Sequence, residues 1–160
     1  MPNAFLSLNN SEYQELIDAV PLIAILIGGA DGDFDEKEQE WAKKIVHIRS
    51  FAHDVDLKPI YQDLDPVFSE KMKSEINSLP SDLIERNKII SERLSRLNLI
   101  FPKLKTAIAA RLYEGYIEFA DQVAKSSGGF MRMLAVTEEE SEWIGLPMLD
   151  PIFLISEEEE

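Results

Sequence analysis

The sequence of 160 residues contains no cysteine and only two histidines, His47 and His53. Disulfide bonds, thiol catalysis and cysteine-containing zinc sites are therefore excluded. The histidines are six residues apart and neither follows a glutamate by three residues, so zinc-protease and di-iron patterns are missing. No lysine follows Gly28-Gly29 to make a phosphate-binding loop, and no serine stands in a nucleophile elbow. We therefore predict that the protein is not an enzyme.

Long apolar runs are also missing. The most apolar run, Ala19 to Ala30, has 12 residues and includes Pro21 and two glycines, whereas a membrane-spanning helix needs about 20 apolar residues. The first 30 residues contain no lysine or arginine, so the charged start of a secretory signal peptide is absent. We expect no membrane span and a cytoplasmic location.

Positive charge is scarce and unevenly placed. The chain has 30 acidic and 16 basic residues, a net charge of −14, so we expect no nucleic-acid partner. Residues 1–66 hold 13 acids and 5 bases (−8), residues 67–113 hold 5 and 9 (+4), and residues 114–160 hold 12 and 2 (−10). Two alternatives follow: the basic middle complements the acidic ends within one fold, or the acidic ends form a docking surface.

Apolar residues, 45% of the chain, recur with helical spacing, and strand-like alternation is not sustained anywhere. We predict an all-α fold: a compact, single-domain bundle of roughly seven helices over residues 1–156, with a solvated acidic tail at 157–160. The most regular apolar stripe consists of Leu104, Ile108, Leu112, Tyr116, Phe119 and Val123.

Capping residues and prolines mark the expected helix ends near the N-terminus. Ser11 predicts the start of the first helix, and Pro21 either interrupts it or begins a second one that ends at Asp31-Gly32. Asp35 predicts the start of the next helix, with Glu38 at the third helical position as in a capping box. The predicted apolar face of that helix consists of Trp41, Ile45 and Ile48.

The sequence pattern at the start of that helix recurs about 100 residues later. In both places a helix stops at a glycine, a capping residue follows, a glutamate comes three residues on, and a tryptophan three after that. This repeat predicts two pseudo-symmetric halves. The matching residues are Asp35, Glu38 and Trp41 in the first half and Thr137, Glu140 and Trp143 in the second.

The nine residues from Ala30 to Glu38 resemble a known family signature. Ala30-Asp31-Gly32, five further residues and Glu38, between an apolar and an amphipathic helix, are similar to the signature of TerB-like tellurite-resistance proteins. The resemblance implies a compact helical domain of two related halves, acidic residues and metal binding at the helix junctions, a role in stress response, and no firmly attached reaction. The second half departs from the pattern, since Ser127 stands where aspartate is expected.

The acidic residues of the first junction are candidate metal ligands. Asp31, Asp33 and Asp35 alternate through an expected tight turn, and calcium and magnesium prefer such oxygen ligands. An EF-hand is excluded, because Glu36 would take the place of its obligatory glycine and Ala42 that of its bidentate glutamate.

Two interpretations of this junction remain open. In the first, Asp35 and Glu38 only cap the helix, and the helix dipole favours their charge. In the second, Asp31, Asp33, Asp35 and Glu38 bind a divalent cation. Glu38 lies on the same predicted helix face as Trp41, and a carboxylate aimed inward needs a cation or hydrogen-bond donors.

A second carboxylate group lies on the helix that carries the regular stripe. Glu114, Glu118 and Asp121 are four and three residues apart and share one helix face. Such a stripe can hold two metals or supply an acid and a base, which makes a carboxylate-based metal enzyme a third hypothesis. We favour a solvated face, because Lys125 follows Asp121 by four residues and suits a surface ion pair.

The second junction contains an apolar loop. Methionine-rich surfaces adapt to partners, and loops on a rigid scaffold often carry function. The loop is either a binding site for a protein partner or a second copy of the chain, or a lid that packs on the core beside Trp143. Its candidate partner-binding residues are Phe130, Met131, Met133 and Leu134.

Overall fold

The computed structural model describes residues 2–29, 34–126 and 143–153. Within these ranges every regular element is helical, so the predicted all-α fold is confirmed. The described residues contain seven α-helices, of which five exceed ten residues and two are short. The helices are α1 (Asn10–Gly28), α2 (Glu36–Arg49), α3 (Lys58–Leu64), α4 (Phe68–Ser78), α5 (Leu83–Ser95), α6 (Leu97–Ile100) and α7 (Thr106–Ser126), with short 3-10 turns at Asn3–Phe5, Asp65–Val67 and Phe101–Lys103.

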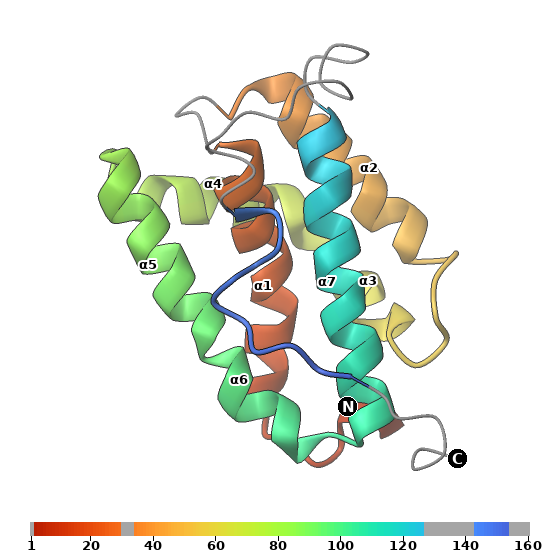
Figure 1. The fold of residues 1–160 in the computed structure, drawn as a ribbon. Helices are drawn as coiled ribbons and strands as arrows, with labels where there is room; N and C mark the ends of the chain where they lie inside the picture. Colours follow the sequence, from red (N-terminus) through yellow and green to blue (C-terminus); the bar gives the residue numbers. More distant parts are fainter. Residues whose placement is uncertain (1, 30–33, 127–142, 154–160) are drawn as a thin grey trace.

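Helix α1 forms the centre of the bundle. Thirteen of its 19 residues are buried, and it packs against α7, α4, α5, α3 and α2. Figure 1 shows α7 and α5 on either side of α1, with the segment 143–153 crossing in front of them. That segment buries Leu146 and Leu149 in the same hydrophobic core. In the part of the chain that the structure describes, no helix is both long enough and apolar enough to cross a lipid bilayer.

The start and the middle of α1 differ from the prediction. Asn9, not Ser11, is the N-cap: its side chain accepts a hydrogen bond from the Glu12 amide at 2.8 Å, and the Glu12 carboxylate accepts one from the Asn9 amide at 3.0 Å. Pro21 neither interrupts α1 nor begins a second helix. Proline removes the amide that would bond the Ile17 carbonyl, and the neighbouring Leu16 carbonyl accepts a bond from the buried Tyr116 hydroxyl at 2.7 Å, which ties this turn of α1 to α7.

The buried face of α2 is rotated from the predicted stripe. Ala42, Ile45, Val46 and Arg49 are buried, whereas Trp41 and Ile48 are each 43% exposed. Successive helical residues are about 100° apart, so a face centred on Ala42 and Val46 turns Trp41 toward solvent. Ile45 is the one member of the predicted stripe that is buried.

Helix α7 follows the prediction closely. Every residue of its predicted stripe, from Leu104 just before the helix to Val123 near its end, is buried. Ala109, Ala120 and Ala124 are also buried beside that stripe, and small side chains let α7 approach α1 closely.

Three other expected helix starts are corrected or lie outside the described residues. Asp65-Pro66 predicts a helix start with proline at its first position, but Asp65–Val67 forms a 3-10 turn and α4 begins only at Phe68. Ser81, after the break at Pro80, is the predicted cap of the next helix, but Asp82 caps α5 instead. The helix expected at Thr137, and with it the match between the two halves, falls outside the described residues, as do the junction residues 30–33 and the acidic tail.

The basic middle block pairs with the acidic first block. Four basic residues of the middle block make five ion pairs with first-block carboxylates, which fits the interpretation that the blocks complement each other within one fold. The pairs are Lys71 with Asp18, Arg96 with Glu15, Lys103 with Glu12, and Arg111 with both Asp54 and Asp56.

Candidate functional site

The acidic junction between α1 and α2 contains a reciprocal capping box. The Asp35 carboxylate accepts a hydrogen bond from the Glu38 amide at 2.8 Å, and the Asp35 amide lies 3.5 Å from Glu38 Oε1. The predicted capping box is therefore present at this pair. Glu38 is also only 6% exposed, because it shares the buried face of α2 with Ala42 and Ile45.

Close packing brings the end of α1 against the start of α2. A Cβ atom on Gly28 would lie 2.4 Å from the Phe34 ring, so no side chain fits at Gly28 while Phe34 stays in place. The Gly29 carbonyl accepts a hydrogen bond from the Arg86 guanidinium of α5 at 2.5 Å. Arg86 therefore brings a positive charge to the end of α1 that adjoins the acidic residues.

The predicted metal ligands are only partly described. Asp35 and Glu38 are placed as above, whereas Asp31 and Asp33 lie outside the described residues. The described ranges alone hold no group of three or more histidine, aspartate or glutamate side chains that could bind a metal ion. A calcium or magnesium site at this junction thus stays a prediction that depends on residues 31 and 33.

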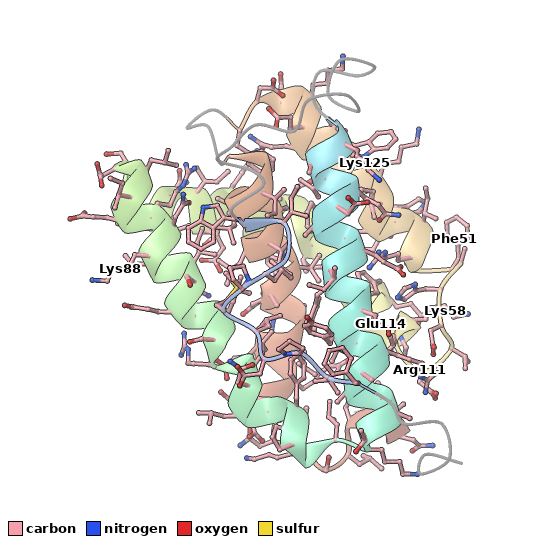
Figure 2. All side chains as sticks on the ribbon, in the orientation of Figure 1. Phe51, Lys58, Lys88, Arg111, Glu114 and Lys125 are labelled. Atoms are coloured by element: carbon pink, nitrogen blue, oxygen red, sulfur yellow. The ribbon has the colours of Figure 1, made fainter. Side chains whose placement is uncertain are left out.

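The carboxylates of α7 lie toward solvent. Glu114 and Glu118 are exposed, and Figure 2 shows Glu114 on α7 between Arg111 and Lys125. Asp121 forms the expected ion pair with Lys125, at 2.8 Å. This geometry is that of a solvated helix face, and the catalytic hypothesis for the stripe stays untested.

The candidate partner loop falls outside the described residues. Phe130, Met131, Met133 and Leu134 all belong to the range 127–142. The residues on either side are well anchored, since Ala124 near the end of α7 and Leu146 after the loop are buried.

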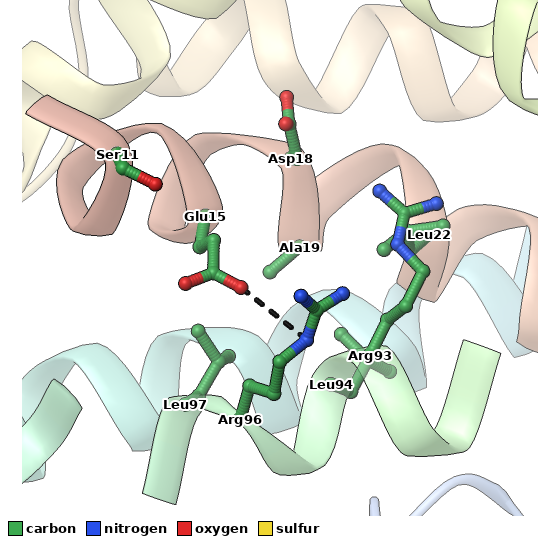
Figure 3. A pocket seen from close by; sticks show the side chains of 9 residues that line it. All are labelled: Ser11, Glu15, Asp18, Ala19, Leu22, Arg93, Leu94, Arg96 and Leu97. Carbon is green, nitrogen blue, oxygen red and sulfur yellow. Dashed lines mark ion pairs between the residues drawn. The ribbon is translucent and has the colours of Figure 1, made fainter. Parts of the chain in front are cut away.

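A hollow of about 230 Å³ lies between α1 and α5, and Figure 3 shows it from close by. Its charged side chains are matched. Arg96 pairs with Glu15 at 3.4 Å, and Asp18 pairs with Lys71 at 2.8 Å. Arg93 forms a two-pronged pair with Glu75 at 2.8 and 2.9 Å. No described charge in this hollow calls for a ligand.

A second hollow, of about 300 Å³, lies between α2 and α7. It has an apolar wall from α2 and the turn after it, and a polar side to which both helices contribute. Its described lining consists of Trp41, Ile45, Ile48, Arg49, Ala52, His53, Glu118 and Gln122.

Arg49 is the central polar residue of this second hollow, and it is only 5% exposed. Its Nη1 donates to the Tyr61 hydroxyl at 2.9 Å and to the Gly115 carbonyl at 3.0 Å, and its Nη2 donates to Gln122 Oε1 at 3.2 Å. The guanidinium also lies over the rings of Tyr61 and Phe119, at 5.3 and 5.6 Å from their centroids. All these partners are neutral, and no described carboxylate lies within 4 Å of Arg49.

The residues around Arg49 add no second positive charge. Burial, with the Arg49 charge as a second cause, lowers the pKa of His53, so its imidazole is neutral at pH 7. His53 packs edge-on against Tyr61 at 5.1 Å, and its Nε2 has no hydrogen-bond partner among the described residues. Burial raises the pKa of Tyr61, which keeps the phenol protonated. In the described lining, Arg49 is the one lysine or arginine and Glu118 is the one aspartate or glutamate.

Arg49 is not among the site residues predicted from the sequence. A signal was present, because Arg49 follows Ala42 by seven residues and Ile45 by four, and both spacings keep a residue on one helix face. The predicted stripe of Trp41, Ile45 and Ile48 lies one residue before the buried positions Ala42, Val46 and Arg49.

Comparison with protein-family models, with curated proteins and with solved structures found no match for this chain.

Proposed function

We propose that the chain is a non-enzymatic, TerB-like cytoplasmic protein that binds a divalent cation, calcium or magnesium, at the junction between α1 and α2 and acts in stress response. The supporting observation is that Asp35 and Glu38 lie together at the start of α2, where the Asp35 carboxylate accepts a bond from the Glu38 amide and Glu38 is only 6% exposed. Asp31, Asp33 and Asp35 precede Glu38 by seven residues or fewer, which concentrates hard oxygen ligands at one short connection.

Two features of the junction oppose a bound cation. The N-terminus of α2 carries the positive end of the helix dipole, and Arg86 brings a further positive charge to the adjoining end of α1. Affinity must therefore depend steeply on how many carboxylates remain ionised, which gives the proposal a direct test.

The test separates metal binding from capping. Asparagine caps a helix about as well as aspartate, and glutamine replaces glutamate in a capping box. The double variant Asp35→Asn with Glu38→Gln therefore keeps the capping pattern and removes two negative charges. Asp82→Asn is the matched control, because Asp82 caps α5 by the same bond, to the Glu85 amide at 3.0 Å.

Calorimetric titration of the metal-free chain with Ca²⁺ and Mg²⁺ gives the measurement. We expect saturable binding of one ion by the parent chain and by the Asp82 variant, and binding at least about tenfold weaker in the double variant. Absence of heat with either ion, or equal affinity in all three chains, would leave capping as the whole role of these residues.

A second candidate function is partner binding by the loop that contains Phe130, Met131, Met133 and Leu134. The supporting observation is that the described residues Ala124 and Leu146, on either side of the loop in sequence, are buried, and loops carried by a rigid scaffold often carry function. Replacing Phe130 and Met133 with serine should abolish association at an unchanged melting temperature. A lid on the core would instead lose roughly 2–5 kcal/mol of stability per large truncation.

A further inference from the structure

The charge of Arg49 lacks a counter-ion in the part of the chain that the structure describes. Removing a guanidinium from water costs several kcal/mol unless an opposite charge or strong hydrogen bonds compensate. Other arginines of the fold have such partners: Arg93 pairs with Glu75, and Arg111 with Asp54 and Asp56. Arg49 is more deeply buried than either of them and bonds only neutral groups.

The guanidinium also keeps donors for a further partner. It has five N–H groups, of which three are used by Tyr61, Gly115 and Gln122. Arg49 lines the hollow between α2 and α7, so an anionic group that enters the hollow reaches a cation already held in place by three hydrogen bonds. A planar guanidinium can donate two parallel hydrogen bonds to the two oxygens of a carboxylate, so a carboxylate is the favoured anion.

The negative charge in the hollow belongs to Glu118, which is exposed. Glu118 lies on the same side of α7 as Gln122, four residues later, and Gln122 accepts a bond from Arg49. Four residues of helix rise about 6 Å. The hollow therefore offers a buried cation and, about one turn along α7, a carboxylate near its mouth. A ligand with a carboxylate and an ammonium group close together matches this pair, whereas a simple anion would face repulsion from Glu118.

The remaining wall is apolar. Trp41, Ile45, Ile48 and Ala52 line it, and Trp41 and Ile48 are each 43% exposed although they are large. A volume of about 300 Å³ stands at the lower end of the range for small-molecule pockets. A branched or aromatic side chain would cover these exposed groups.

We propose that the hollow between α2 and α7 binds a free α-amino acid with an apolar side chain. The carboxylate of the ligand lies on Arg49, its ammonium group on Glu118, and its side chain against Trp41 and Ile48. This site differs from the acidic junction, because Arg49 and Ile48 belong to the last turn of α2.

Three related ligands test the charge pattern. L-leucine has both charged groups, isocaproate lacks the ammonium group, and isoamylamine lacks the carboxylate. Titration of the full chain by calorimetry, with NMR observation of the Trp41 indole and the Gln122 side-chain amide, is expected to show saturable binding of leucine at these two residues. Isocaproate and isoamylamine should each bind at least about tenfold more weakly, the loss of one charge-assisted contact.

Two exposed residues of α7 provide matched variants. Glu118→Gln removes the proposed ammonium partner, and Glu114→Gln removes the same charge one turn earlier, from a residue outside the described lining. Both are exposed, so neither should change the melting temperature. We expect Glu118→Gln to weaken leucine binding to the level of isocaproate and Glu114→Gln to leave it unchanged.

The proposal fails if neither leucine nor phenylalanine binds, if isocaproate binds as tightly as leucine, or if the two α7 variants behave alike. Arg49→Met is the further variant, expected to abolish binding of leucine and isocaproate alike. If the Arg49 variant does not fold, the difference in leucine affinity between Glu118→Gln and Glu114→Gln still tests the proposal.

Discussion

Replacing Arg49 with methionine measures how the fold tolerates a buried cation with neutral partners. Methionine keeps most of the unbranched side chain and removes the guanidinium. The variant loses the hydrogen bonds to the Tyr61 hydroxyl and the Gly115 carbonyl. Gln122 is exposed, so water replaces its bond.

The expected change in unfolding free energy is a difference of two terms. Two buried hydrogen bonds from a charged donor contribute roughly 3–6 kcal/mol in total, at about 1.5–3 each. Removal of the guanidinium also removes its desolvation cost, which is several kcal/mol. We expect a net destabilisation of about 1–3 kcal/mol, seen as a fall in melting temperature of roughly 2–12 °C for a chain of this size.

A double-mutant cycle with Tyr61→Phe tests the reasoning. The Tyr61 side chain is fully buried, so Arg49→Met leaves its hydroxyl without the Arg49 donor. Phenylalanine has no hydroxyl to strand, and the double variant should therefore be less destabilised than the sum of the single variants by about 1–2 kcal/mol. Urea denaturation followed by circular dichroism gives the three values. Additive effects, or an Arg49 variant more stable than the parent, would refute the reasoning.

Three further changes have defined expectations. Asp35→Ala removes the α2 cap and should cost about 0.5–2 kcal/mol by urea denaturation, whereas Asp35→Asn should cost far less. Burial lowers the pKa of His53 in the folded state below 6.5, the ordinary value for histidine. Below pH 6.5 the unfolded chain therefore binds more protons than the folded chain, and the free energy of unfolding decreases as pH falls toward the lower folded pKa. His53→Gln should reduce this pH dependence of the unfolding free energy relative to the parent. Asn98 donates to the Met148 carbonyl and accepts from the Asp150 amide, both at 2.9 Å; Asn98→Ala should speed hydrogen exchange and proteolysis in residues 143–153 while α1 stays protected.

Sequence patterns predicted those elements in which one local rule decides the structure. The α7 stripe from Leu104 to Val123 repeats at regular helical spacing, so one periodicity rule decides which face is buried, and every predicted position is buried. The Asp35 and Glu38 cap was likewise predicted, because its two bonds form between residues three apart in the chain.

Sequence patterns gave wrong predictions where contacts between residues distant in sequence determine the structure. Helix α2 packs against α3, α7, α1 and α4, so its buried face is set by the best fit to several neighbours and not by its largest apolar residues. Trp41 is left exposed for this reason. Pro21 is accommodated inside α1, although it removes one backbone hydrogen bond, because α1 is buried on every side around it by helices distant in sequence.

One candidate site is formed by residues adjacent in sequence and the other by residues that only the fold brings together. The acidic junction is a run of neighbouring residues, so it is visible in the sequence itself. The hollow around Arg49 combines α2, the following turn and α7, and its polar groups come from residues 49 to 122. No local spacing brings Arg49, Glu118 and Gln122 together, so only the packed structure identifies this site.

The most direct test of the proposed cation site is to locate the ion on the chain. Mn²⁺, a paramagnetic ion that accepts the same oxygen ligands, is added stepwise to the isotopically labelled full chain while amide signals are recorded. At low Mn²⁺ we predict selective broadening of the amides between residues 31 and 38, reversed by excess Mg²⁺ or Ca²⁺, with α6 unaffected. Broadening that spares this junction, or that spreads evenly over the acidic surface, would contradict the proposed site.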